Sequence, residues 1–406
     1  MNDLLMAWRN LWRNTRRSIL TISAIVFATA LLVFMLSFQF GAYDDMIDSS
    51  VRLSTGHVQV IAPGYHDKPR MRDVVANPLD IEAAAVPLPQ VDNLTMRAEA
   101  SILASGESRS KGLLLTGVIP DRERDLSLVP GQIIEGRYLQ GGDRAVGVIG
   151  SLAARNLQVG IGDDCVFLGS GRDGSIAASV VQIVGIYKSG INEFDRSTMQ
   201  IPLAEFDEVF SMNGAVHRVV LTLENLSATY QAAPALQNDP RTEGLQVMTW
   251  DELTPGLRQS IELDLVGGVI MYFILVVVVA FSILNTFFMA IFERKKEFGV
   301  LMSIGMKPRR LVKLMLLESM SMTGVGLALG IVVGIAITLA GSHWGIGMGD
   351  SSEFMAQYGM PERLYPKLTL LSVVLGPLLI CAVTFLTALI PVLKIPRLHP
   401  VEALRS

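Results

Sequence analysis

Two long runs without a charged side chain, separated by a short basic stretch, constrain this chain more than any other feature. The runs cover residues 265–292 and 319–343, and Lys and Arg crowd the stretch between them. Each run exceeds the about 20 apolar residues that a helix needs to cross a hydrocarbon core of roughly 30 Å. Because short loops rich in Lys and Arg stay on the cytoplasmic side, we expect two spans joined by a cytoplasmic loop.

The same criterion, applied to the whole chain, predicts an α-helical membrane protein with four transmembrane helices. These helices cover residues 18–43, 263–292, 318–341 and 367–393. The other segments alternate between the two sides of the membrane, starting in the cytoplasm, and cover residues 1–17, 44–262, 293–317, 342–366 and 394–406. Four crossings place both termini in the cytoplasm.

The segment 44–262, between transmembrane helices 1 and 2, has the composition of a large water-facing domain. Its phrases GHVQVIAPG, RAEASILASG and KGLLLTGVIP are apolar runs bounded by Gly or Pro, which is typical of strands. A helical pattern follows near residues 227–236. We therefore expect an α+β domain inserted between the first two transmembrane helices.

The N-terminal segment 1–17 is predicted to be an amphipathic helix on the membrane surface. Trp8 and Trp12 share one arc of the helix, and Arg9 and Arg13 lie on the neighbouring arc. A signal peptide is the alternative, but the apolar run that follows exceeds the about 7–15 residues of such a segment.

Helical spacing also marks the basic segment 293–317. Its apolar residues include Phe298 and Leu301, Gly305 is suited to end a helix, and Pro308 is suited to begin the next. In transmembrane helix 3, three glycines recur at every fourth position, which lets another helix approach closely. They are Gly326, Gly330 and Gly334.

No motif for catalysis or for a bound cofactor is found in the sequence. It holds no G-x-x-x-x-G-K-[ST] phosphate loop and no H-E-x-x-H, and the five histidines have no metal-ligand spacing. Cys165 and Cys381 fall in different predicted segments, so we expect no disulfide between them. A net charge of −4 and the absence of basic runs with interleaved aromatics give no sign of nucleic-acid binding. We expect no catalytic residue, metal or cofactor in this chain.

The phrases EFGVLMSIG and MKPRRL resemble the coupling segment of the FtsX-like permease family of ABC transporters, with Met302 where that family has a basic residue. TGVIPDRERDLSLVPGQIIEGRYL and VGVIGSLAARNLQVGIGDDCVFLG resemble the MacB-like periplasmic core. STGHVQVIAPGY resembles the opening of lipoprotein-releasing permeases, and PVEALR resembles the family's tail.

The resemblance implies two functional surfaces. Contact with an ATPase would use Glu293, Glu297, Phe298, Gly299, Leu301, Ile304 and Gly305. We expect the apolar Phe298 and Leu301 to fill a groove on that ATPase; a basic loop that only sets topology is the alternative. A lateral access path for lipid-linked cargo would be lined by Phe27, Leu31, Phe34, Met35, Phe38, Met271, Ile274 and Val278, whose alternative role is helix packing or lipid contact.

The implied function is that of a permease subunit in a bacterial inner membrane, with its large domain in the periplasm. Two copies of a separate cytoplasmic ATPase would bind ATP and Mg²⁺ and move the periplasmic domain. The further partners are membrane lipid, a second permease subunit, identical or paralogous, and a periplasmic cargo or acceptor protein. The short amphipathic lead before helix 1 favours release of lipoproteins or lipidated cargo. MacB-type export of peptides or drugs and FtsX-type activation of a cell-wall hydrolase remain alternatives.

Overall fold

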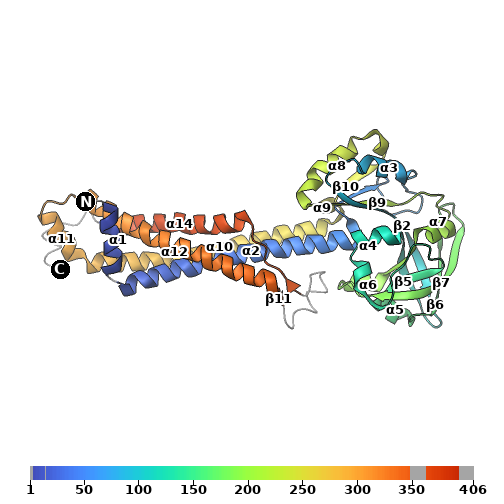
Figure 1. The fold of residues 1–406 in the computed structure, drawn as a ribbon, viewed down its shortest axis with the longest axis horizontal. Coiled ribbons are helices and arrows are strands. Elements are labelled where there is room, and N and C mark those ends of the chain that lie inside the picture. Colours follow the sequence, from blue (N-terminus) through green and yellow to red (C-terminus); the bar gives the residue numbers. More distant parts are fainter. Residues whose placement is uncertain (1–2, 14, 348–362, 393–406) are drawn as a thin grey trace. The chain divides into compact units, whose positions relative to one another are not determined.

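The computed structural model describes residues 3–13, 15–347 and 363–392, and these fold into two compact units (Figure 1). The helical unit is built from the described residues up to 43 together with those of 261–347 and 363–392. The sheet unit is built from residues 44–260. Most of the outer loop expected at 342–366 and the whole tail expected at 394–406 lie outside the described residues.

Six helices make up most of the helical unit, and α2 and α10 also reach into the sheet unit. The six are α1 (Asp3–Arg13), α2 (Thr15–Ser50), α10 (Pro255–Glu293), α11 (Lys295–Ser303), α12 (Pro308–Trp344) and α14 (Leu370–Val392). A two-residue ladder joins β11 (Ile346–Gly347) to β12 (Arg363–Leu364). Within the described residues, four helical segments are long and apolar enough to cross a membrane: Ser18–Thr55, Pro255–Glu293, Pro308–Trp344 and Leu370–Ile390.

The helices run further than the uncharged spans expected from the sequence. Helix α2 continues to Ser50, and α10 begins at Pro255. Charged residues set the limit of a hydrocarbon-compatible stretch, but they do not break a helix, so the helical backbone continues past them.

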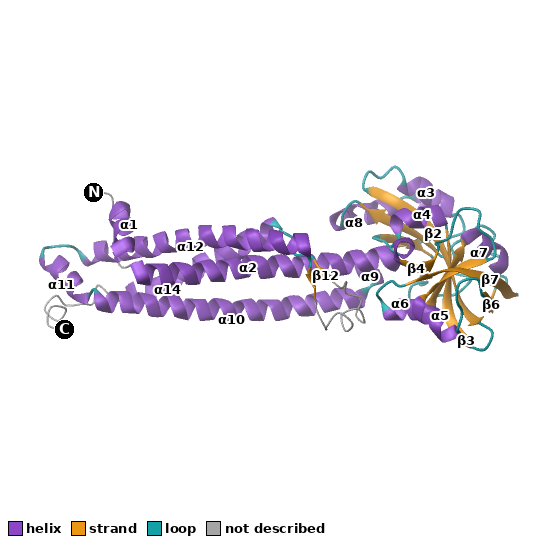
Figure 2. Cartoon of the chain, turned by 60° about the horizontal axis from the view of Figure 1, so that its bottom comes forward, coloured by secondary structure: helices purple, strands orange, loops and turns teal. Residues whose placement is uncertain are grey.

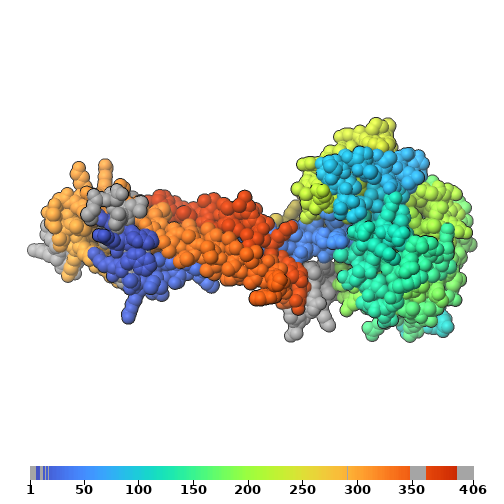
Figure 3. Space-filling model, in the orientation of Figure 1, coloured from blue at the N-terminus to red at the C-terminus, as the bar shows by residue number. Residues whose placement is uncertain are grey.

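One apolar core holds the long helices together. Ile25 and Leu32 of α2 pack with Val276 of α10 and with Ile380 and Ala388 of α14. Helices α12 and α14 also lie side by side, in orange and red in the space-filling view (Figure 3). Helix α2 therefore shares one apolar core with α10 and α14.

The sheet unit contains ten strands, drawn in orange in Figure 2. They are β1 (Val58–Ile61), β2 (Val91–Ser105), β3 (Ser110–Val118), β4 (Ile133–Gly136), β5 (Val146–Gly150), β6 (Asp164–Ser170), β7 (Ile176–Tyr187), β8 (Thr198–Pro202), β9 (Arg218–Leu223) and β10 (Gln246–Thr249). Their order is β10-β1-β9-β2-β3-β8-β5-β7-β4, and β6 pairs with β2 and β7. The seven α-helices of the unit's own fold are α3 (Pro78–Ala85), α4 (Pro120–Leu126), α5 (Ser151–Leu157), α6 (Asn192–Ser197), α7 (Leu203–Phe210), α8 (Thr229–Gln237) and α9 (Trp250–Leu253).

Strand β2 links two cores within this unit. Its first half pairs with β9 as far as Arg97, and its second half pairs with β3 from Ala98 onward. Met96 belongs to the core around α3 and α8, whereas Ala98 and Ile102 belong to the core around α5 and α7. The change of partner falls at Arg97.

Arg97 forms a buried ion pair at this point. Its Nε and Nη2 donate to the two carboxylate oxygens of Glu123, each at 2.8 Å, and Glu123 is fully buried. Its Nη1 donates to the Ser54 carbonyl at 2.6 Å. Ser54 lies in the π-helical turn η1 (Val51–Thr55), which directly follows α2. A buried charge thus holds the end of α2 to the sheet.

Glu123→Gln should lower the free energy of unfolding of the sheet unit by about 3–5 kcal/mol, because it leaves a buried guanidinium without its carboxylate. Pulse proteolysis of the full-length protein in urea measures the change. The matched control is Glu208→Gln, since the Glu208 side chain is 80% exposed and pairs loosely with Arg144 at 3.6 Å. Equal urea midpoints for the two variants would show that the buried pair contributes nothing beyond an exposed one.

Candidate coupling site and transmembrane seam

The basic segment folds as a short helix, a turn and a long helix. Helix α11 covers Lys295–Ser303, Gly305 has φ +100°, and Pro308 is the first residue of α12. A positive φ strains any residue with a Cβ, so glycine suits this turn. The missing N–H of Pro308 costs nothing in a first helical turn.

The ring of Phe298 is buried inside the chain itself. It is 2% exposed and packs with Ile291 of α10 and with Leu311 and Met315 of α12, and the half-buried Leu301 joins this cluster. The ring thus completes the core at the junction of three helices, and its contact with an ATPase stays a prediction.

Other apolar side chains of α11 and its C-terminal end face solvent. Val300 is 46% exposed and Ile304 is 79% exposed. Gly299 is buried, whereas Glu293, the last residue of α10, is exposed. The free apolar surface of this segment thus centres on Val300 and Ile304.

Four charged side chains of alternating sign join α1, α11 and α12. Nη2 of Arg13 donates to the two carboxylate oxygens of Glu297 at 2.8 and 2.6 Å. Arg294 donates through Nε to Glu297 at 3.2 Å and through Nη1 to Glu318 at 3.0 Å. Its guanidinium also lies over the Phe298 ring, 5.6 Å from the ring centre.

The electrostatics of Glu297 follow from this arrangement. Partial burial raises its pKa, but the hydrogen bonds from Arg13 and Arg294 outweigh that effect and hold the pKa of the carboxyl below its usual range. The carboxylate is therefore charged at neutral pH.

Sequence reasoning missed Arg13 and Glu318 as members of this cluster, whereas pairing of Glu297 with Arg294 could be expected from their spacing. Arg13 and Glu297 are 284 positions apart, so no local pattern joins them. Glu318 carried a usable signal, because an ionisable residue beside an uncharged span usually has a partner.

The three glycines of α12 lie against α2. A Cβ at Gly326 would come within 2.7 Å of Ile25, one at Gly330 within 2.6 Å of Thr29, and one at Gly334 within 2.9 Å of Val33. We call this contact the glycine seam. The glycines of α12 and the residues that they face on α2 both repeat every four residues, so the two helices touch along matching faces.

The residues assigned to a lateral access path divide into two groups. On α2, Phe27 is 68% exposed. The other α2 members are half-buried, namely Leu31, Phe34, Met35 and Phe38. Phe34 and Phe38 stack with ring centres 6.1 Å apart. The α10 members are all exposed: Met271, Ile274 and Val278. The inward face of α10 packs on α2 through other residues, among them Val276.

A polar layer, also missed from the sequence, closes the contact of α2 with α10 beside these residues. The Gln39 amide donates to the Tyr43 hydroxyl at 2.7 Å and to the Asp264 carboxylate at 3.1 Å, and it accepts from the Tyr272 hydroxyl at 2.7 Å. A Cβ at Gly268 would come within 2.6 Å of this amide, so the glycine provides its space.

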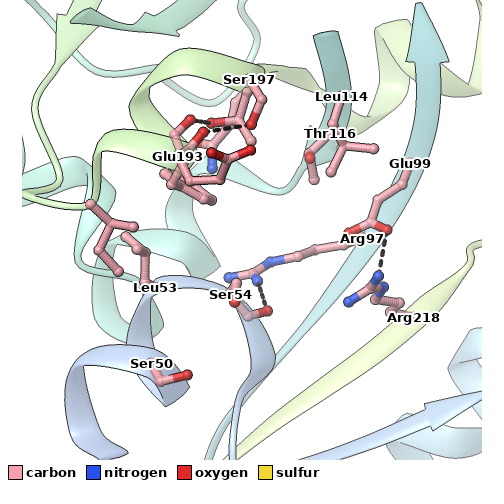
Figure 4. Close-up of a pocket in the computed structure, with 14 residues that line it drawn as sticks. Ser50, Leu53, Ser54, Arg97, Glu99, Leu114, Thr116, Glu193, Ser197 and Arg218 are labelled. Carbon is pink, nitrogen blue, oxygen red and sulfur yellow. Dashed lines mark hydrogen bonds and ion pairs between the residues drawn. The ribbon is translucent and has the colours of Figure 1, made fainter. Parts of the chain in front are cut away.

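The sheet unit has a cavity of about 400 Å³ beside the buried ion pair (Figure 4). Arg97, Glu99, Thr116, Glu193 and Arg218 line it, and Arg218 pairs with Glu99 at 2.8 Å. Its charges of both signs are largely paired with one another. Among the described residues, no group of His, Cys, Asp and Glu could hold a metal ion.

Two family profiles match most of the chain. The profile of the MacB-like periplasmic core domain matches residues 18–239, and that of the FtsX-like permease C-terminal region matches residues 269–400. The chain belongs to the FtsX-like permeases with a MacB-like core. It is an ABC transporter permease, in which α11 lies within the region matched by the C-terminal profile.

Individual relatives and one solved domain are similar to this chain. The lipoprotein-releasing system transmembrane protein LolC of Xylella fastidiosa is 21% identical over 96% of this chain and 93% of that protein. The macrolide export ATP-binding/permease protein MacB of Rhodospirillum rubrum is 23% identical over 99% of this chain and 60% of that protein. The crystal structure of the extracellular domain of the transporter YknZ from Gram-positive bacteria is 19% identical, with a TM-score of 0.35, over 47% of this chain and 98% of that chain.

Gly330→Val should separate α2 from α12, because its side chain would overlap Thr29 where backbone contact now holds the helices together. The expected result is a lower midpoint of thermal unfolding for the purified permease in detergent. Gly324→Val is the matched control in the same helix, since nothing lies within 4 Å of a Cβ there. If Gly324→Val loses as much stability as Gly330→Val, the loss comes from placing valine in a helix and not from the glycine seam.

Proposed function

We propose that this chain is the permease subunit of a transporter that extracts lipoproteins or similarly lipidated cargo from the inner membrane. Two copies of a separate cytoplasmic ATPase bind ATP and Mg²⁺ and press on α11 of two permease subunits, identical or paralogous. The observation that carries the proposal is the way α11 is packed in the structure. It is fixed to α10 and α12 through Phe298 and Arg294, yet it presents the apolar Val300 and Ile304 to a partner.

The proposed orientation follows from charge. Lys295 and Lys296 begin α11, and Arg309 and Arg310 lie in the first turn of α12, and a short segment with this basic excess favours the cytoplasmic side. Both termini lie on that side, and the sheet unit lies in the periplasm. A rigid α11 then passes a push from the ATPase to two transmembrane helices at once.

Lipidated cargo is favoured over soluble cargo by two features. The likeness to LolC extends over nearly the full length of both chains, whereas the likeness to MacB covers 60% of that protein. Removing an acyl chain from lipid costs about 0.8 kcal/mol for each CH₂, so extraction needs an apolar surface that receives the chain. The exposed Phe27, Ile274 and Val278 offer such surfaces on α2 and α10.

Ile304→Asp should weaken ATPase binding without disturbing the permease fold, because Ile304 is 79% exposed and its burial in a partner is worth about 1.5–3 kcal/mol. Co-purification with the native ATPase measures the loss. Phe298→Ala is the contrasting variant: the core cavity it creates should lower the thermal unfolding midpoint of the permease alone. If the Ile304→Asp permease assembles normally with the ATPase, then the surface around Ile304 does not bind the ATPase.

Photo-crosslinkers at Phe27 and Ile274 test the cargo in cells whose lipoproteins carry labelled acyl chains. We expect crosslinks to acylated protein that decrease when ATP is hydrolysed, because the chain leaves the membrane in that step. Leu339, an exposed residue of α12, serves as the control for ordinary lipid contact. If the crosslinks reach phospholipid alone and soluble peptides or drugs stimulate the ATPase, the proposal of lipoprotein release is wrong and the chain is an export permease.

A further inference from the structure

Helix α1 is tied to the proposed coupling helix by its last residue. Arg13 ends α1, and its side chain reaches Glu297 of α11. The body of α1 packs on α12, where Ala7 is fully buried. Trp8 and Trp12 remain 44% and 47% exposed and meet edge to face, with ring centres 6.2 Å apart. An exposed tryptophan pair beside arginines is suited to the headgroup region of a membrane.

The bond from Arg13 completes a chain of charges whose inner end is fixed. Glu318 is 4% exposed within α12, and Arg294 connects it to Glu297. Arg294 alone can hold one oxygen of Glu297, because its other bond goes to Glu318. The second guanidinium, on α1, contacts both carboxylate oxygens and therefore restricts the direction in which Glu297 points.

We propose that Arg13 is a positioning residue of the coupling segment. By holding Glu297, it makes the surface helix α1 move together with α11, so that α11 presents its exposed apolar side chains in one orientation. The proposal rests on the proposed role of α11 as the segment that receives the motion of the ATPase. It assigns to α1 a part in transmission, in addition to its contact with lipid.

The strength of this link sets what an experiment can detect. The Arg13 and Glu297 side chains are 55% and 48% exposed, and exposed ion pairs are weak and screened by salt. Loss of the pair should therefore change turnover by a small factor and should remove a dependence on ionic strength. A residue that served only the fold would show neither behaviour.

The test uses the full permease with its native ATPase, reconstituted in nanodiscs. Arg13→Gln should lower kcat for ATP about two- to fivefold, the factor that an exposed pair supplies. The KM for ATP and the amount of assembled complex should stay unchanged. Glu297→Gln should act in the same direction, and the double variant should turn over no more slowly than Glu297→Gln alone. Arg9→Gln, at an exposed arginine of the same helix, is the matched control and should behave as the native protein.

The second measurement follows kcat as NaCl rises from about 50 to about 500 mM, a range in which the Debye length shrinks severalfold. The native complex and Arg9→Gln should fall toward the level of Arg13→Gln, whose own activity should be nearly independent of salt. Additive losses in the double variant, or the same salt profile for all variants, would overturn the proposal.

The two proposals fail differently. If Ile304→Asp lowers assembly while Arg13→Gln leaves kcat and its salt profile unchanged, α11 remains the docking helix and Arg13 has no positioning role. If the ATPase assembles with Ile304→Asp as with the native permease, the proposed function of α11 fails, and the inference about Arg13 fails with it.

Discussion

The close approach of α2 and α12 at the glycine seam is the contact on which the helical unit depends. Between apolar helices in a lipid environment, packing gains replace the hydrophobic effect as the driving force, so backbone proximity decides which helices associate. Gly376 of α14 also allows a close approach to α2, since a Cβ there would meet Leu32 of α2 at 3.0 Å. Helix α2 is consequently approached closely by two helices and packs on a third, α10, through larger side chains.

Polar contacts are placed at the two ends of this apolar bundle. On α10, Asp264 binds Gln39 near one end, and Glu293 ends the helix next to the Arg294 cluster. The 29 residue steps from Asp264 to Glu293 span about 44 Å of helix. That length exceeds a hydrocarbon core of roughly 30 Å, so both polar clusters can remain in the interfacial regions while the seam lies between them.

Features set by local spacing could be predicted from the sequence, whereas features set by tertiary contact could not. The uncharged runs, the glycine repeat and the turn at Gly305 each depend on residues that are close in the sequence, and the structure has helices and a turn at these positions. The packing of Phe298 could not be predicted, because its helical spacing shows that it lies on an apolar face but not what covers that face. The cover comes from α10 and α12. The change of strand partner at Arg97 was equally invisible, since it depends on the order of strands from distant parts of the chain.

Two of the arginine–glutamate pairs, Arg97–Glu123 and Arg13–Glu297, differ in burial and therefore in strength. Arg97 and Glu123 are almost fully buried, so breaking the pair is costly and Ser54, just beyond the end of α2, stays attached to the sheet. Arg13 and Glu297 are about half exposed, so their bond can open and re-form at little cost. Helix α2 begins two residues after Arg13 and continues unbroken to Ser50. The weak, exposed pair therefore lies within the helical unit beside α11, and the strong, buried pair lies within the sheet unit.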